Sequence, residues 1–363
     1  MSTKIKKVYI TISALFLFAA SLFIGVLLSG NLGNVIGAFS NSKDTVAETF
    51  TDQSVESTSI KSKTEQPEIV RGIWLTAGID YLVDNSDSAE VKKNEIDNIT
   101  AEIKKMGFNT VFLDYTSEAE SRMYLSLGNY NELEYLISTA RKNGLFIVSN
   151  LSVSDFINSS DKTEVDDKIL CDYCKKYNSD ALMISGFETL NSNISEKLEF
   201  DGLIPMIKNI AQDVLKSDEY LLFGIQIEPD NKMQNIANEL FADSSVDFIY
   251  LEPEASHNDD DSYVDIIERW NKSLINSGGK CILGQKADLL FKSDSWSDPN
   301  EIIIQSTQAE KLESCCGTAF RSYHIIKNNE KGIGTAFCEY LKNVNNNIKE
   351  REFEITNQKG KEI

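Results

Sequence analysis

Two glutamates that each end an apolar run are the residues whose type and spacing most suggest chemistry. Glu228 and Glu252 are each followed at once by a proline, which stops a strand and so holds the glutamate at its end. Two carboxyl groups that flank a glycosidic bond can cleave it, at ~5–5.5 Å apart with retention or ~6.5–9.5 Å apart with inversion of configuration. The sequence therefore predicts Glu228 and Glu252 as candidate catalytic residues, with Glu188 as the third.

Polar and aromatic side chains near the other expected strand ends are candidates for binding a substrate. Aromatic rings offer flat apolar faces on which a sugar ring can stack. Arg321 either contacts an anionic group or forms an ion pair with Asp80 on the adjacent first strand. Trp74 and Trp270 fall inside a strand and a helix and are expected in the core. The candidate binding residues are Asp80, Tyr81, Asp114, Tyr115, Asn150, Glu254, Gln285, Arg321 and Tyr323.

Eight short apolar runs, each followed by an amphipathic stretch, position these side chains. Such runs are typical of strands buried on both faces, and their alternation with helices predicts a parallel sheet. Eight units in about 250 residues match a closed (β/α)8 barrel, a TIM barrel of the α/β class, whose functional residues lie at the C-terminal ends of the strands. The expected strands are residues 69–76, 110–115, 145–150, 181–186, 220–227, 246–251, 280–284 and 317–323.

The first thirty residues have a different character. Lysines at positions 4, 6 and 7 precede an uncharged apolar run of about 21 residues, 8–28. At ~1.5 Å per residue, a helix of this length crosses ~30 Å of hydrocarbon. The lysines favour a cytoplasmic N-terminus. We therefore predict a single-pass signal anchor in the cell membrane, with the barrel on the extracytoplasmic side. The alternative is a secreted protein cleaved near residues 37–38.

Composition divides the chain into four segments. Residues 1–30 are the expected cytoplasmic stub and transmembrane anchor. Residues 31–66 are rich in Ser, Thr, Asp, Glu and Asn and lack apolar periodicity, which predicts a disordered linker. The barrel is expected over residues 67–345, and a polar tail over residues 346–363.

Charge and metal-binding residue types exclude several partners. The 363 residues include 56 Asp and Glu against 36 Lys and Arg, a net charge of −20, which repels phosphate backbones, so no nucleic-acid partner is expected. There are only two histidines, and the Cys171–Cys174 CxxC falls inside an expected helix without a second pair. We therefore expect no metal and no cofactor. Cys281 and either Cys315 or Cys316 begin neighbouring strands, so a disulfide is conceivable there.

The segment Arg71-Gly72-Ile73-Trp74-Leu75-Thr76 resembles the first strand of the glycosyl-hydrolase-like 10 family. That resemblance implies a secreted or surface-attached bacterial (β/α)8 barrel related to glycoside hydrolases. The match covers most of residues 70–340. Further segments resemble family motifs in the same order: 107–112 (GFNTVF), 176–181 (KYNSDA), 223–225 (FGI), 246–249 (VDFI), 284–285 (GQ) and 296–305 (WSDPNEIIIQ).

The chain departs from this family where the family carries its carboxylates. The family's fourth strand typically ends in a run such as DGIHFDDYFYP, but Ser185 and Gly186 stand here at the paired Asp positions. We therefore favour a membrane-anchored barrel that binds carbohydrate, with the family's catalytic pair degenerate. The alternative is an active glycoside hydrolase that uses strand-end glutamates on a cell-wall or extracellular polysaccharide. Whether the protein is an enzyme stays open at this point.

Overall fold

A computed structural model describes residues 66–81, 88–115, 131–155, 167–187, 200–255, 261–286, 300–321 and 323–345. The chain divides into two units, Met1–Ser59 and Ile60–Ile363, and every described residue belongs to the second. The predicted anchor at residues 8–28 and the predicted tail at 346–363 lie outside the described residues. Where the structure describes the chain, none of its helices combines the length and the apolar character that a bilayer crossing requires.

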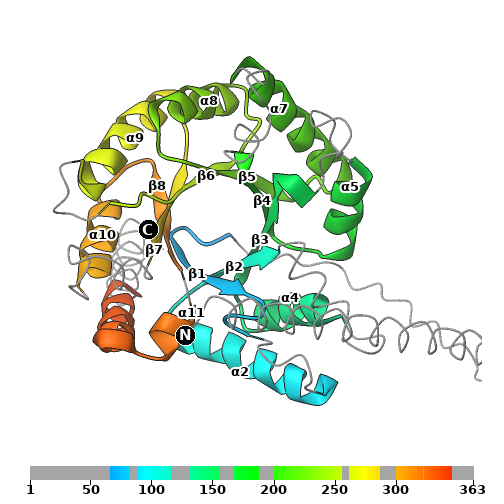
Figure 1. Cartoon of the computed structure of the whole chain (residues 1–363), viewed down its shortest axis with the longest axis vertical. Coiled ribbons are helices and arrows are strands. Elements are labelled where there is room, and N and C mark those ends of the chain that lie inside the picture. The colour runs from blue at the N-terminus through cyan, green and yellow to red at the C-terminus, as the bar shows by residue number, and fades with distance from the viewer. Residues whose placement is uncertain are drawn as a thin grey trace, which may run out of the picture. The chain divides into compact units, whose positions relative to one another are not determined.

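Eight parallel strands close into a barrel in the order of the sequence, and helices surround it (Figure 1). Each strand pairs with the next along the chain, and the last pairs with the first. The predicted eight-stranded barrel is therefore confirmed. The strands are β1 Val70–Thr76, β2 Thr110–Tyr115, β3 Phe146–Ser152, β4 Ala181–Ser185, β5 Leu222–Ile227, β6 Phe248–Leu251, β7 Cys281–Lys286 and β8 Cys315–Arg321.

The helices follow the strands as the amphipathic stretches predict. Helix α2 begins at an N-cap serine, Ser88, and ends at Gly107, and α9 begins with a capping box at Ser262. These polar caps satisfy backbone N–H groups that have no partner within the helix. The helices are α2 Ala89–Met106, α4 Glu132–Lys142, α5 Asp167–Lys176, α7 Phe200–Ser217, α8 Asn231–Ala242, α9 Tyr263–Ser277, α10 Glu301–Ala309, α11 Tyr323–Lys327 and a last helix over residues 333–345.

Side chains alternate between two apolar cores because successive residues of a strand point to opposite faces. The outward residues pack against the helices in one large cluster, which includes Trp270. The inward residues form a second cluster inside the barrel, where the rings of Trp74, Phe112 and Tyr250 contact one another at centroid distances of 5.3–5.6 Å. Both tryptophans predicted to be core residues are buried, and the three inward rings form the floor beneath the C-terminal mouth.

An irregularity in β8 decides which of its residues face inward. The pairing of β8 with β7 shifts by one residue between Cys281/Cys315 and Leu283/Thr318. Gly317 sits in this shift at φ 138°, and a Cβ there would lie 2.1 Å from the carbonyl oxygen of Val70. Glycine is needed at such a position.

The prediction that β8 runs to Tyr323 is wrong. The strand ends at Arg321, and Tyr323 begins α11 instead. The six cysteines are free thiols. Cys281 and Cys315 are direct neighbours in the sheet, and both pack with the outer cluster, whereas Cys316 packs with the inner one.

Candidate functional site

A cavity of about 410 Å³ opens at the C-terminal ends of β5, β6 and β7. Parallel strands that close into a barrel all end at the same rim, and this rim carries the active sites of such barrels. Glu228 and Glu252, the two predicted catalytic residues, both line the cavity. The other lining residues are Gln226, Ile227, Pro229, Asp230, Glu254 and Lys286.

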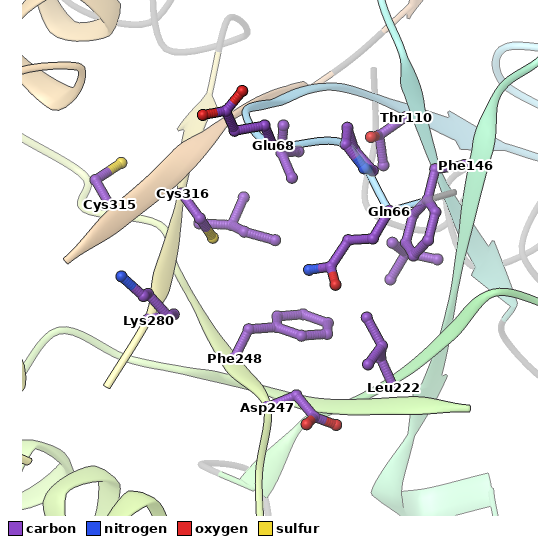
Figure 2. Close-up of a pocket in the computed structure, with 14 residues that line it drawn as sticks. Gln66, Glu68, Thr110, Phe146, Leu222, Asp247, Phe248, Lys280, Cys315 and Cys316 are labelled. Carbon is purple, nitrogen blue, oxygen red and sulfur yellow. The ribbon is translucent and has the colours of Figure 1, made fainter. Parts of the chain in front are cut away.

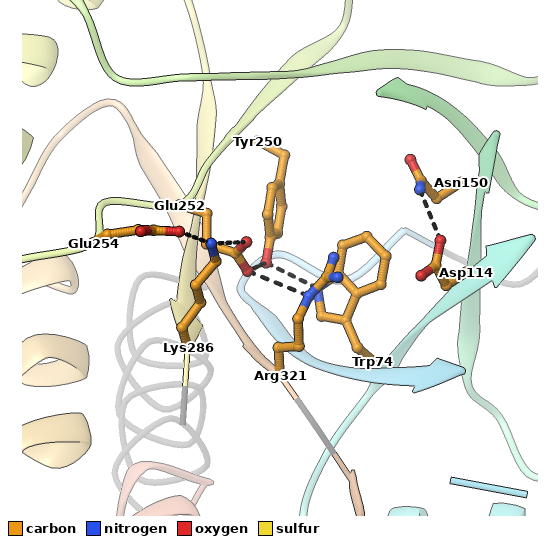
Figure 3. A network of polar contacts seen from close by, with 8 residues as sticks. All are labelled: Trp74, Asp114, Asn150, Tyr250, Glu252, Glu254, Lys286 and Arg321. Atoms are coloured by element: carbon orange, nitrogen blue, oxygen red, sulfur yellow. Dashed lines mark hydrogen bonds and ion pairs between the residues drawn. The ribbon is translucent and has the colours of Figure 1, made fainter. Parts of the chain in front are cut away.

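Glu252 is the centre of a buried polar network at this mouth (Figure 3). The indole Nε1–H of Trp74 donates to the Tyr250 hydroxyl at 2.8 Å, and that hydroxyl donates to Glu252 Oε1 at 3.1 Å. Burial is the main cause that raises the pKa of Tyr250 well above its usual range, and the charge of Glu252 adds to it. The phenol therefore stays protonated and can act as a donor to the carboxylate.

Two cations flank the same carboxylate. Arg321 Nε lies 3.4 Å from Glu252 Oε1, and Lys286 Nζ lies 3.7 Å from Glu252 Oε2. The residue Glu252 is 8% exposed, and a buried carboxylate requires such partners because its desolvation is otherwise costly. Lys286 also pairs with Glu254 at the cavity's edge.

Arg321 covers the aromatic floor of the mouth. Its guanidinium carbon lies 3.8 Å from the centre of the Trp74 ring, a cation–π contact. Figure 3 shows the guanidinium between the indole and Glu252. The predicted alternative, an ion pair between Arg321 and Asp80, is not formed; Asp80 instead accepts hydrogen bonds from the backbone N–H of Thr76 and of His324.

The network depends on a missing side chain in β7. A Cβ on Gly284 would lie 2.4 Å from the Tyr250 hydroxyl and 2.9 Å from Cγ of Glu252. Neither neighbour can move freely, since Tyr250 is fully buried inside the barrel. Glycine at position 284 therefore leaves the space that Tyr250 and Glu252 occupy.

A second polar pair lies on the other side of the mouth. The Asn150 amide Nδ2 donates to Asp114 Oδ1 at 3.2 Å, and Figure 3 shows this pair across the Trp74 ring from Glu252. Asn150 faces the barrel interior, since its strand neighbours Phe146 and Val148 belong to the inner cluster. Asn150 is 4% exposed, and its Oδ1 has no hydrogen-bond partner among the residues that the structure describes.

Glu228 differs from Glu252 in its surroundings. It is exposed, and within the described part of the chain its carboxylate has neither an ion pair nor a hydrogen bond. The turn that follows it is fixed, because Asp230 caps α8 through the backbone N–H groups of Lys232 and Met233. Glu228 therefore presents an unengaged carboxylate on a fixed backbone.

Several other predicted site residues point away from the mouth. Gln285 faces outward and donates to the carbonyl of Ile302 and to Ser306, both on α10. Tyr81 and Tyr323 are buried in the outer cluster, and the Tyr323 hydroxyl donates to Glu102 on α2 at 2.7 Å. These side chains fix helices against the barrel.

Two more predicted site residues have a limited description. Tyr115 ends β2, and Glu188 lies outside the described residues.

Sequence reasoning missed Tyr250 and gave Lys286 no role. The alternation Phe248, Tyr250, Glu252 carries the signal for Tyr250, because residues two apart on a strand face the same side. Lys286 stands two residues after Gly284 and shares its inward face. Tracing back by two residues from Glu252 would have found Tyr250.

A second cavity, of about 380 Å³, lies at the N-terminal ends of the strands (Figure 2). Its walls are largely apolar and include Phe146, Leu222 and Phe248. Asp247, which belongs to the 246–249 motif and lines this cavity, accepts a hydrogen bond from the backbone N–H of Phe223 at 2.7 Å. In barrels of this type the N-terminal end contributes stability, and the C-terminal end carries function.

Among the residues that the structure describes, no three His, Cys, Asp or Glu side chains come close enough together to hold a metal ion. No protein-family model matches the sequence, and no curated protein matches it significantly.

Solved structures of glycoside hydrolases resemble this chain in fold. A β-glucuronidase of Bacteroides uniformis superposes with a TM-score of 0.50 at 11% identity, over 71% of this chain and 31% of its own. A GH18 chitinase from Pseudoalteromonas aurantia gives 0.48 at 10% identity, over 76% and 98%. An endocellulase from the archaeon Pyrococcus horikoshii gives 0.47 at 12% identity, over 71% and 85%. This chain thus spans about a third of the glucuronidase, and the likeness is one of fold.

Proposed function

We propose that the protein binds carbohydrate at the C-terminal mouth of its barrel. The observation that carries the proposal is the cavity in which Glu228, Glu252 and Lys286 converge from three neighbouring strands. A pocket of a few hundred Å³ with several convergent polar groups is the usual form of a small-molecule site. Carboxylates and amides at fixed positions bind the hydroxyl groups of a sugar.

Hydrolysis of a glycosidic bond is the second candidate function. It is favoured by one observation, that Glu228 and Glu252 line a single cavity from adjacent strands. In this reaction Glu252, oriented by Tyr250 and Arg321, would serve as the nucleophile or stabilise the positive sugar ring. Glu228 would protonate the leaving oxygen. The exposure of Glu228 argues against this role, because a general acid is normally kept protonated by burial.

A panel of soluble and insoluble polysaccharides separates the two functions. The full-length protein is assayed for release of reducing sugar and for binding. Release that disappears in Glu228→Gln or Glu252→Gln would establish hydrolysis. Binding without release would establish the binding function, and neither result on any polysaccharide would refute both.

We also propose that residues 8–28 anchor the protein in the membrane with the barrel outside. The support is the uncharged apolar run and the lysines that precede it, which are typical of a membrane-spanning segment with a cytoplasmic N-terminus. The ordered motifs of the barrel further support membership of the glycosyl-hydrolase-like 10 family, whose members act at the bacterial envelope. Protease treatment of intact cells tests the topology: digestion of the barrel is expected, and full protection of the barrel would contradict it.

A further inference from the structure

We infer that the mouth selects a sugar that carries free ammonium groups, a deacetylated amino sugar, over an anionic sugar. The inference rests on the proposed carbohydrate-binding function and names its substrate class. Its basis is the direction of the hydrogen bonds and the sign of the charges around the mouth.

Three donors at the mouth are directed to acceptors within the protein. The indole N–H of Trp74 is directed to Tyr250, and the Tyr250 hydroxyl to Glu252. The Asn150 amide N–H is directed to Asp114. Lys286 contacts both Glu252 and Glu254. A ligand that accepts hydrogen bonds from these groups would have to break these contacts.

Two acceptors at the mouth, in contrast, receive no hydrogen bond from a donor in the described part of the protein. The carboxylate of Glu228 has no protein donor among the residues described. On the other side of the mouth and outside the lining of the cavity, Asn150 is buried except for 4% of its surface, and its Oδ1 accepts no hydrogen bond from the described residues. A buried acceptor without a donor costs free energy unless a ligand or water supplies one. The mouth is therefore suited to a ligand rich in N–H and O–H donors.

The charges select further among such ligands. Of the described residues that line the cavity, four are carboxylates and one is a lysine; the carboxylates are Glu228, Asp230, Glu252 and Glu254. Lys286 and the nearby Arg321 are both paired with Glu252. A uronic acid would place another carboxylate against this excess, and like charges repel. An ammonium group carries a positive charge and three donors, which matches both the charge and the free acceptors.

The test compares oligosaccharides that carry positive, neutral or negative charge. Binding of chitosan oligosaccharides, their N-acetylated chitin counterparts and oligogalacturonates to the full-length protein is measured by titration calorimetry at about pH 6. We expect the chitosan oligosaccharides to bind roughly tenfold tighter than the chitin ones, as removal or addition of a charge-assisted hydrogen bond implies. We expect the oligogalacturonates to bind most weakly.

A matched pair of variants distinguishes the site from the charge of the whole protein. Glu228→Gln removes a carboxylate from the cavity, and Glu268→Gln removes one from the exposed face of α9. Glu228→Gln is expected to abolish the roughly tenfold preference for chitosan over chitin oligosaccharides. Glu268→Gln is expected to retain that preference. Equal or tighter binding of the neutral or anionic ligands, or equal effects of the two variants, would overturn the inference while leaving carbohydrate binding intact. No binding of any oligosaccharide would refute the proposed function as well.

Discussion

Replacing Tyr250 by phenylalanine tests the polar network on which the candidate site is built. The substitution removes one oxygen atom that accepts from Trp74 Nε1–H at 2.8 Å and donates to Glu252 Oε1 at 3.1 Å. A hydrogen bond to a charged group contributes about 1.5–3 kcal/mol, and a buried donor left without a partner costs about 1–3 kcal/mol. Since the two effects share one hydroxyl, we expect Tyr250→Phe to lower the free energy of unfolding by about 2–4 kcal/mol.

The chain contains a matched control for this substitution. Tyr263, on α9, is also fully buried, and its hydroxyl has no hydrogen-bond partner in the described part of the chain. Removal of an unpaired buried hydroxyl relieves a desolvation cost, so Tyr263→Phe is expected to leave stability unchanged or to raise it slightly. Urea unfolding monitored by tryptophan fluorescence measures both free energies. Equal losses in the two variants would show that the Trp74–Tyr250–Glu252 chain has no special energetic role.

Two further predictions concern the same barrel. Gly284→Ala should lower the free energy of unfolding by about 1–3 kcal/mol through overpacking. The loss should be smaller in a Tyr250→Phe background, because the contact at 2.4 Å involves the Tyr250 hydroxyl. Additive effects of the two substitutions in urea unfolding would contradict this. Burial raises the pKa of Tyr81 well above its ordinary value of 10.0, so above pH 10 the unfolded chain releases a proton that the folded chain keeps. Stability should thus fall as pH rises above about 10, by up to about 1.4 kcal/mol per pH unit for this group, and Tyr81→Phe should lessen that slope in alkaline unfolding; parallel curves would contradict it.

The sequence was sufficient to predict the barrel because strands buried on both faces leave a strong local signal. All eight expected strands end within two residues of the observed ends. The eighth was expected to end at Tyr323, but that residue begins α11 and the strand ends at Arg321. A buried aromatic residue occurs both in strands and in the first turn of helices. The residue type of Tyr323 therefore could not show where β8 ends and α11 begins.

The site was less predictable because inward and outward positions alternate at every residue. Gln285 and Lys286 are neighbours in sequence, yet Gln285 holds α10 and Lys286 lines the cavity. A shift of one residue exchanges the two faces of a strand. The pairing of Arg321 with Glu252 depends in addition on the register shift of β8 at Gly317. No local sequence pattern predicts that shift.

The location of a bound sugar tests the central claim most directly. A crystal structure of the full-length protein with an oligosaccharide identified in the binding screen is expected to show a sugar ring in the cavity at the C-terminal mouth. Its hydroxyl or amino groups should lie within ~3.2 Å of Glu228 or Glu252. A sugar bound instead in the cavity at the N-terminal ends of the strands, or on the outer face of the helices, would contradict the account.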